Sequence, residues 1–368
     1  SNTIFIGKES GTANTTGLRN IAIGPYAYNA ADTESDNIAI GYDALGGAVA
    51  GGEKNIAIGN YSLDALTSAD GVVAIGHEAG TSVTTGTENV MVGYRAGNNI
   101  TTGTANTMIG YDAGVLTDSY QNTVIGFKAG DSVSGSDGAN TLIGAEAMGS
   151  ASASDVVAVG KWTILDNTAD GTVAIGTEAG RKHESGTGAT YLGYKAGWAN
   201  TTGSRNLAIG YRAYDNADTE SDNIAIGYDA LGGPIADGEK NIAIGNYALD
   251  ALTSADEVVA IGYGAGGAIT TGGNNTVVGN RALEATTDGI NNVALGTESL
   301  IANTSGTRNI AVGKEALAGN LTGSNNVGIG EDAGKGATES YYNTSVGNFA
   351  LSNTTQSVGR NSAFGGRS

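Results

Sequence analysis

A phrase of five residues, Asn-Ile-Ala-Ile-Gly, recurs along this sequence and limits the folds open to the chain. It stands intact at 20–24, 37–41, 55–59, 223–227 and 241–245. Related phrases bring the number of closing glycines to 22, from Gly7 to Gly365, at spacings of 16 to 18 residues. Because the repeat leaves no room for a separate domain, the sequence predicts one continuous array over 1–368.

Each slot of the repeat has its own residue type. Asn stands four residues before the glycine in 16 of the 22 units, and an apolar residue precedes the glycine in all of them. Ala or Ser follows three residues later, with Thr163 the one exception. Representative slot residues are Asn20, Ile21, Ile23, Gly24, Ala27, Asn37, Gly41, Asn223 and Gly227. A catalytic site needs its groups once, so we interpret these residues as structural.

The composition of each unit favours short strands joined by turns. The chain has 61 glycines and 2 prolines, and a unit of about 17 residues lacks an uninterrupted run of good helix formers. Short β-branched segments bounded by Gly, Asn, Asp and Thr are typical of strands. We therefore predict an all-β fold: a repetitive parallel β-solenoid of about 22 coils of ~17 residues, each with two short strands and two turns.

Both faces of the predicted strand are apolar. The two Ile side chains of the phrase point one way and Ala points the other, because a strand alternates faces. Burial on both sides is then implied, yet one small coil encloses a single interior. We expect the second face to meet another chain, although the sequence does not say which face that is. Thr in the first slot is usually followed by a larger residue, as in Thr190–Tyr191, which we interpret as volume compensation across the strand.

A larger duplication overlies the short repeat. Residues 18–80 match 204–266 at 50 of 63 positions, with a constant offset of 186. Such a duplication lengthens an array without changing its lateral contacts. Because Ser1 already lies within a repeat phrase, we also expect this chain to be a fragment of a longer one.

Charge and composition argue against several classes of partner. The net charge of −19 predicts repulsion from nucleic acids and anionic membranes. The sequence has no cysteine for a disulfide or a thiolate metal site, and no apolar run of ~18 residues for a membrane helix. We expect no catalytic residues, no bound metal, no cofactor, no membrane insertion and no enzymatic activity.

Some residues nevertheless have the chemistry of a site. His77 and His183 are the two histidines, and we expect both at the surface. The acidic loop residues Asp32, Glu34 and Asp36, copied as Asp218, Glu220 and Asp222, offer oxygen ligands for Ca²⁺, but lack known calcium-loop spacings. We interpret them as solvated charge.

Aromatic residues give two further candidates. Tyrosine follows the repeat glycine at positions 42, 94, 111, 194, 211, 228 and 263, where stacking along the array is favoured over a sugar platform. The least regular region, 156–203, contains a candidate recognition surface of Trp162, Arg181, Lys182, His183 and Trp198. Local repacking of an irregular coil is the alternative interpretation.

The Asn-Ile-Ala-Ile-Gly phrase with Ala three residues later resembles the head repeats of trimeric autotransporter adhesins and the repeat regions of bacteriophage tail-fibre proteins. The resemblance covers essentially the whole chain, although the period here is longer than in the adhesin heads. It implies a left-handed parallel β-roll assembled as a homotrimer.

We therefore expect the structural and adhesive shaft of a phage tail fibre or phage-like particle. It would be extracellular, as part of a virion, and would position receptor binding at a bacterial surface. Its partners would be copies of itself, and a cell-surface glycan or protein bound through flanking or tip regions. The head of a bacterial trimeric surface adhesin is the alternative, and a β-solenoid carbohydrate-active enzyme or an ice-binding solenoid is more remote.

Overall fold

The computed structural model describes residues 2–115, 118–131, 138–149, 153–352 and 359–367. The chain divides into two compact units, Ser1–Glu184 (unit 1) and Ser185–Ser368 (unit 2). Each unit is a parallel β-solenoid whose described residues form strands and turns and no helix. The prediction of an all-β parallel solenoid is confirmed within each unit, while continuity of the array over 1–368 stays a prediction.

Every coil contributes one strand of three residues. The strands of unit 1 are β1 (Ile4–Ile6), β2 (Ile21–Ile23), β3 (Ile38–Ile40), β4 (Ile56–Ile58), β5 (Val73–Ile75), β6 (Val90–Val92), β7 (Thr107–Ile109), β8 (Thr123–Ile125), β9 (Thr141–Ile143), β10 (Val157–Val159) and β11 (Val173–Ile175). Those of unit 2 are β12 (Thr190–Leu192), β13 (Leu207–Ile209), β14 (Ile224–Ile226), β15 (Ile242–Ile244), β16 (Val259–Ile261), β17 (Thr276–Val278), β18 (Val293–Leu295), β19 (Ile310–Val312), β20 (Val327–Ile329), β21 (Thr344–Val346) and β22 (Ser362–Phe364).

The prediction of two strands per coil is wrong for the described residues. After the repeat glycine, alternate residues adopt left-handed backbone conformations, as at Tyr26 (φ 62°) and Tyr28 (φ 53°), and such residues cannot continue a strand. Their backbone groups still bond from coil to coil, because Tyr26 N–H donates to the Lys8 carbonyl at 2.9 Å. The remainder of each coil is therefore hydrogen-bonded turn.

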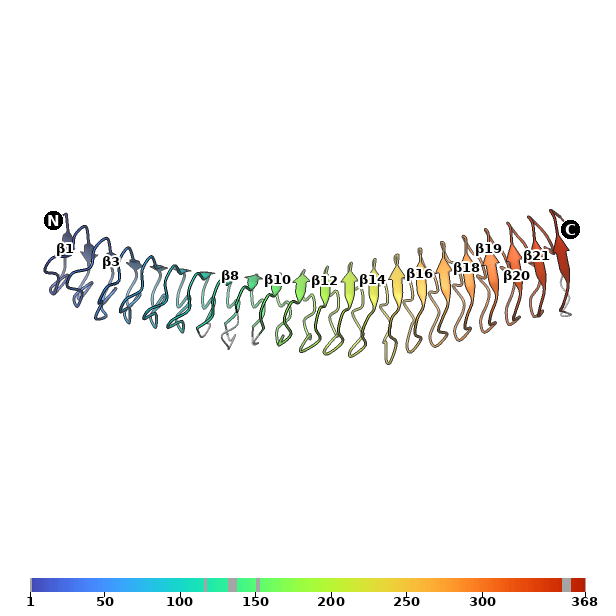
Figure 1. Ribbon diagram of the computed structural model, residues 1–368, viewed down its shortest axis with the longest axis horizontal. Coiled ribbons are helices and arrows are strands. Elements are labelled where there is room, and N and C mark those ends of the chain that lie inside the picture. The colour runs from blue at the N-terminus through green and yellow to red at the C-terminus, as the bar shows by residue number, and fades with distance from the viewer. Residues whose placement is uncertain (1, 116–117, 132–137, 150–152, 353–358, 368) are drawn as a thin grey trace. The chain divides into compact units, whose positions relative to one another are not determined.

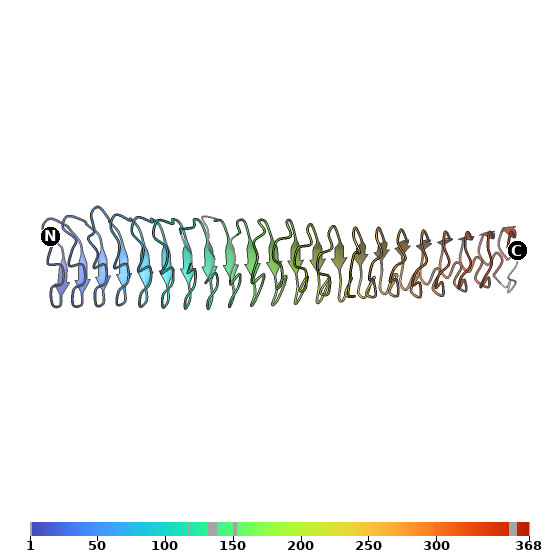
Figure 2. The same ribbon diagram turned by 90° about the horizontal axis from the view of Figure 1, so that it is seen from below.

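Equivalent residues of successive coils lie directly beside one another. Ile21 pairs with Ile38, Ala22 with Ala39 and Ile23 with Ile40, and the same parallel register continues along each unit. Figure 1 shows the strands of unit 1 (blue to green) in one row, and Figure 2 shows the same row after a quarter turn. Because the coils stack in register, each position of the repeat forms a column of similar residues.

The repeat asparagine forms a buried column that links the coils. The side-chain oxygen of Asn20 accepts the backbone N–H of Asn37 at 2.9 Å, and Asn37 does the same for Asn55. The amide nitrogen of Asn20 donates to the Glu34 carbonyl at 2.7 Å. All three asparagines are at most 1% exposed. Both ends of the amide are satisfied inside the protein, as a buried polar group requires.

The repeat glycine is required by space and by conformation. Gly24 has a φ of 132°, and a Cβ there would lie 2.4 Å from the carbonyl oxygen of Gly41 in the next coil. Neither condition allows a side chain.

The structure assigns the two apolar faces. The middle residue of each strand points into the coil, where Ala22, Ala39 and Ala57 have no exposed surface. The first and third residues point outward and are half-buried or exposed, as in β2 and β5. In these coils the strand contributes small side chains to the interior, and its larger aliphatic residues form an outer face.

Interior volume is balanced between the middle of the strand and the fourth residue after the repeat glycine. Phe5 stands opposite Gly11, where a Cβ would lie 2.7 Å from the ring, whereas the small Ala22 shares its coil with the buried Tyr28. Further large–glycine contacts are Met91–Gly97, Met108–Gly114 and Tyr191–Gly197. The compensation predicted across the strand is misplaced, because Thr190 lies on the outer face and shares no interior volume with Tyr191.

Candidate functional site

Two of the predicted recognition residues do meet. The Lys161 ammonium lies 3.6 Å from the centre of the Trp162 ring, and the Arg181 guanidinium lies 5.0 Å from it. Arg181 also pairs with Glu178 at 3.2 Å. Trp162 is half-buried beneath these two cations, and its left-handed φ of 57° is the one found throughout its slot. The cluster can be explained as packing between neighbouring coils.

His183 does not belong to any surface site. Its side chain has no exposed surface, which corrects both the predicted surface histidine and its place in the recognition surface. In its coil, Ala174 and Gly180 leave interior space, and His183 occupies the slot that Val83 and Ile269 fill in equivalent coils. The prediction failed because a coil with small residues at both of these interior positions must fill the remaining space with another side chain, here His183. Lys182 is exposed, and His77 is exposed as predicted.

Trp198 belongs to unit 2 and lies in a hollow there. The cavity has a volume of about 240 Å³ and is lined by Tyr194, Lys195, Trp198, Tyr211, Arg212, Asp215 and Asn216. Lys195 lies 5.5 Å from the Trp198 ring, and Arg212 pairs with the buried Asp215 at 2.6 Å. The sequence analysis singled out Trp198, Tyr194 and Tyr211 separately and did not identify Lys195, Arg212 or Asp215. Arg212 and Asp215 come from the next coil, after β13.

Surface aromatic residues form a ladder in each unit, as predicted. In unit 1 the ring contacts run Tyr26, Tyr42, Tyr61, His77, Tyr94, Tyr111 and Phe127, and in unit 2 they run Tyr194, Tyr211, Tyr228, Tyr247 and Tyr263. Tyr94 and Tyr111 stack at 5.0 Å, whereas Tyr247 and Tyr263 meet edge to face. The ring geometry therefore changes along a ladder.

The acidic loops are not simply solvated charge. Glu34 is only 5% exposed, and its carboxylate accepts the backbone N–H groups of Asp32, Thr33 and Gly51, each at 3.0 Å. Glu220 holds the duplicate loop through Asp218, Thr219 and Asp237. The prediction is wrong for these two glutamates, because each carboxylate replaces water with backbone donors.

The aspartates of the same loops have different partners. Asp36 forms two bonds with Arg19, at 2.5 and 2.6 Å, and Asp222 does the same with Arg205. Hydrogen bonding from the arginine lowers the pKa of each aspartate. Asp32 and Asp218 accept bonds from Thr15 and Thr201. Within the described ranges, no group of three His, Cys, Asp or Glu residues is arranged to hold a metal ion.

Comparisons with known proteins do not identify a family for this chain. No protein-family model matches the sequence, and no curated protein is similar to it. None of the described segments forms a helix long and apolar enough to cross a membrane. Functional inference therefore depends on the surfaces of the two units.

Proposed function

We propose that this chain is a structural and adhesive fibre shaft whose copies associate side by side through the outer face of the β-solenoid. The chain would act in the extracellular part of a phage tail fibre or phage-like particle and hold receptor-binding regions at a bacterial surface. The proposed assembly is a homotrimer of left-handed β-rolls, following the resemblance of the repeat. No catalytic step is assigned to it.

The observation that carries this proposal is the outer apolar column. The third strand residue is Ile, Val or Leu in all coils from β1 to β21, and it faces away from the interior. Ile75, Leu192 and Ile329 are 37, 43 and 40% exposed. Contiguous exposed aliphatic surface of this kind is typical of an interaction face.

The size of this face fits association between copies. With two outer side chains per coil and roughly 50 Å² exposed on each, eleven coils offer about 1,000 Å², compared with about 800 Å² per partner in a stable interface. A second copy has the same spacing between coils, so its columns match over the full length of a unit. A globular partner would match only part of it.

The mass in solution tests the proposal directly. Light scattering after size-exclusion chromatography should give about three times the chain mass of 36.5 kDa. A monodisperse species at the single-chain mass would contradict self-association. The head of a bacterial trimeric surface adhesin, the alternative function, would give the same mass.

A further inference from the structure

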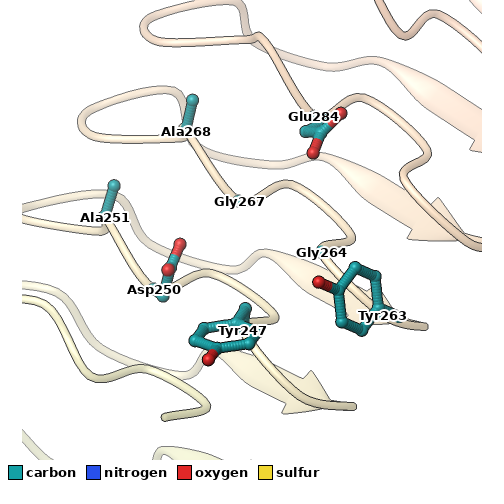
Figure 3. A pocket seen from close by; sticks show the side chains of 8 residues that line it. All are labelled: Tyr247, Asp250, Ala251, Tyr263, Gly264, Gly267, Ala268 and Glu284. Carbon is teal, nitrogen blue, oxygen red and sulfur yellow. The ribbon is translucent and has the colours of Figure 1, made fainter.

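A hollow of unit 2 lies beside the end of its aromatic ladder. It has a volume of about 550 Å³ and is lined by Tyr247, Asp250, Ala251, Tyr263, Gly264, Gly267, Ala268 and Glu284. Figure 3 shows the two tyrosine rings on one side of this hollow and the two carboxylates at different heights along it. Three successive coils therefore supply aromatic and acidic groups to one surface depression.

The two tyrosines have ring surface available for a ligand. Tyr211 and Tyr228 stack with an interplanar angle of 2°, so each covers a face of the other. The angle is 62° between Tyr228 and Tyr247 and 83° between Tyr247 and Tyr263. In an edge-to-face pair, the ring that presents its edge keeps both faces free of its neighbour, and Tyr263 is 51% exposed. The rings that border the hollow are therefore not stacked face to face.

The charge of the hollow favours a positive ligand. Burial raises the pKa of the Asp250 carboxyl, and the negative charges of Asp229 and Glu284 raise it further. Among the described residues no ion pair involves Asp250, whereas Glu284 is paired with Arg281 at 2.7 Å. A half-buried carboxylate beside other carboxylates is stabilised by an entering cation. Aromatic faces attract cations as well.

We propose that this hollow binds an amino sugar with a free ammonium group, as one residue of a glycan. The apolar face of the sugar ring packs on Tyr247 or Tyr263, and the ammonium group lies beside Asp250. The same charges disfavour sugars that carry carboxylate or phosphate groups. Naming a glycan deepens the surface-attachment role and depends on that proposed function, whereas the ligand's charge follows from the cavity alone.

Neighbouring hollows indicate a chain of sugars rather than a single residue. Asp250 also lines a second hollow of about 180 Å³ with Arg212, Asp229 and Gly232. Arg212 in turn lines the hollow that contains Trp198. The three depressions share residues in pairs, so a polymer can follow them from coil to coil within unit 2.

The positions of unit 1 that are equivalent to this cavity suggest a variant that fills it. With the offset of 186, Tyr61 and Asp64 correspond to Tyr247 and Asp250. The other lining positions differ, because His77, Glu78, Thr81, Ser82 and Asn98 stand in the places of Tyr263, Gly264, Gly267, Ala268 and Glu284. A Cβ at Gly267 would lie 3.3 Å from the Gly264 carbonyl oxygen, which must shift slightly, and 3.5 Å from the Asp250 carboxylate, at ordinary contact distance. Gly267→Thr should therefore fill the hollow without a change of charge and without disturbing a backbone that already accepts threonine in unit 1.

The test is calorimetric titration of the full chain with three β-1,4-linked oligosaccharides, of glucosamine, N-acetylglucosamine and glucose. The titrations are made at low salt and below the pKa of the sugar amine. We expect the glucosamine oligomer to bind at least about tenfold more tightly than the other two, a ratio equivalent to ~1.4 kcal/mol. Equal affinity for all three, or no binding, would overturn the proposal.

Three variants separate the cavity from general attraction to an acidic chain. Gly267→Thr should weaken glucosamine-oligomer binding about tenfold or more, and Asp250→Asn should remove the preference for the amine. Asp64→Asn, the equivalent change in unit 1, should leave both unchanged. Unaltered affinity in Gly267→Thr, with an unaltered melting temperature, would show that binding is nonspecific and the proposal wrong. The mass measured on the same samples reports self-association separately.

Discussion

The ring of Tyr191 occupies the space that a side chain at Gly197 would need. A Cβ at Gly197 would lie 2.2 Å from the ring, and Tyr191 has no exposed surface. Its hydroxyl donates to the side-chain oxygen of Asn200 at 3.0 Å. In the next coil the order is reversed, since Ala208 takes the strand position and Tyr214 the later one. One interior volume is thus filled from either of two slots.

This exchange predicts a rescue. Tyr191→Ala should reduce the free energy of unfolding by about 3–5 kcal/mol through the cavity it leaves. Gly197→Leu alone should be at least as harmful, because the leucine would overlap the ring. The double variant reproduces the Ala225–Leu231 arrangement found two coils further along and should recover about 1–3 kcal/mol of coupling energy in denaturant titrations. Strictly additive losses would show that the two residues do not share a volume.

The asparagine column should be costly to interrupt. Asn223→Val removes the acceptor for the Asn241 N–H and the donor to the Tyr214 hydroxyl and the Gly238 carbonyl. Leaving these buried groups unpaired should cost about 1–3 kcal/mol, measured by urea unfolding. Asn246, which is exposed in the next coil and accepts the Tyr228 N–H at 3.0 Å, gives the control Asn246→Val. A smaller loss at Asn223 than at Asn246 would contradict the structural role of the column.

Outer-face substitutions should weaken association and spare the fold. Ile→Thr at Ile224 and Ile242 uses a residue that the chain itself has in this slot at Thr190 and Thr276. We expect the dissociation constant of the assembly to rise about tenfold or more, with the circular dichroism spectrum unchanged. Sedimentation over a range of concentrations measures the change. Unchanged association would place the interface on another surface.

High pH should unfold the protein through its buried tyrosines. Burial raises the pKa of Tyr28 from 10.0 to about 12, and burial raises the pKa of Tyr214 further. The neutral hydroxyl is the stabilised form, so its contribution is complete below pH 10 and is lost as the pH rises towards 12. Tyr28→Phe should flatten the fall in stability over this range. Thermal melting at several alkaline pH values, with Tyr42→Phe as the exposed control, checks this.

Removing the charge of a buried glutamate should destabilise the protein at its loop, and calcium should not restore the stability. Glu220→Gln removes the negative charge that accepts three backbone N–H groups. We expect a loss of about 1–3 kcal/mol in the free energy of unfolding, because hydrogen bonds to charged groups are the stronger ones. Adding Ca²⁺ should shift neither the wild type nor the variant. A calcium-dependent rise in melting temperature would revive the metal interpretation.

The repeat alone determined the period, the parallel register and the need for glycine. A spacing of 16 to 18 residues from Gly7 to Gly365 can be satisfied by stacking equivalent residues, because each coil then meets only its neighbours. The sequence also showed that both strand faces are apolar. It could not say which one is inside, because the alternation in Ile21–Ile23 is the same whichever face is enclosed.

Tertiary structure decided that question and everything that follows from it. Contacts across the interior of a coil, such as that between Tyr191 and Gly197, join a strand residue to a turn residue. The alternation of side chains along the strand does not predict such contacts. The same cross-coil packing buries His183 and Glu34, although their residue types suggested the surface. The hollow at Asp250 depends on three coils meeting and on two glycines, Gly264 and Gly267, whose equivalent positions in unit 1 are Glu78 and Thr81. The spacing of the repeat can be read from the sequence, whereas only the folded coil defines which side chains are enclosed.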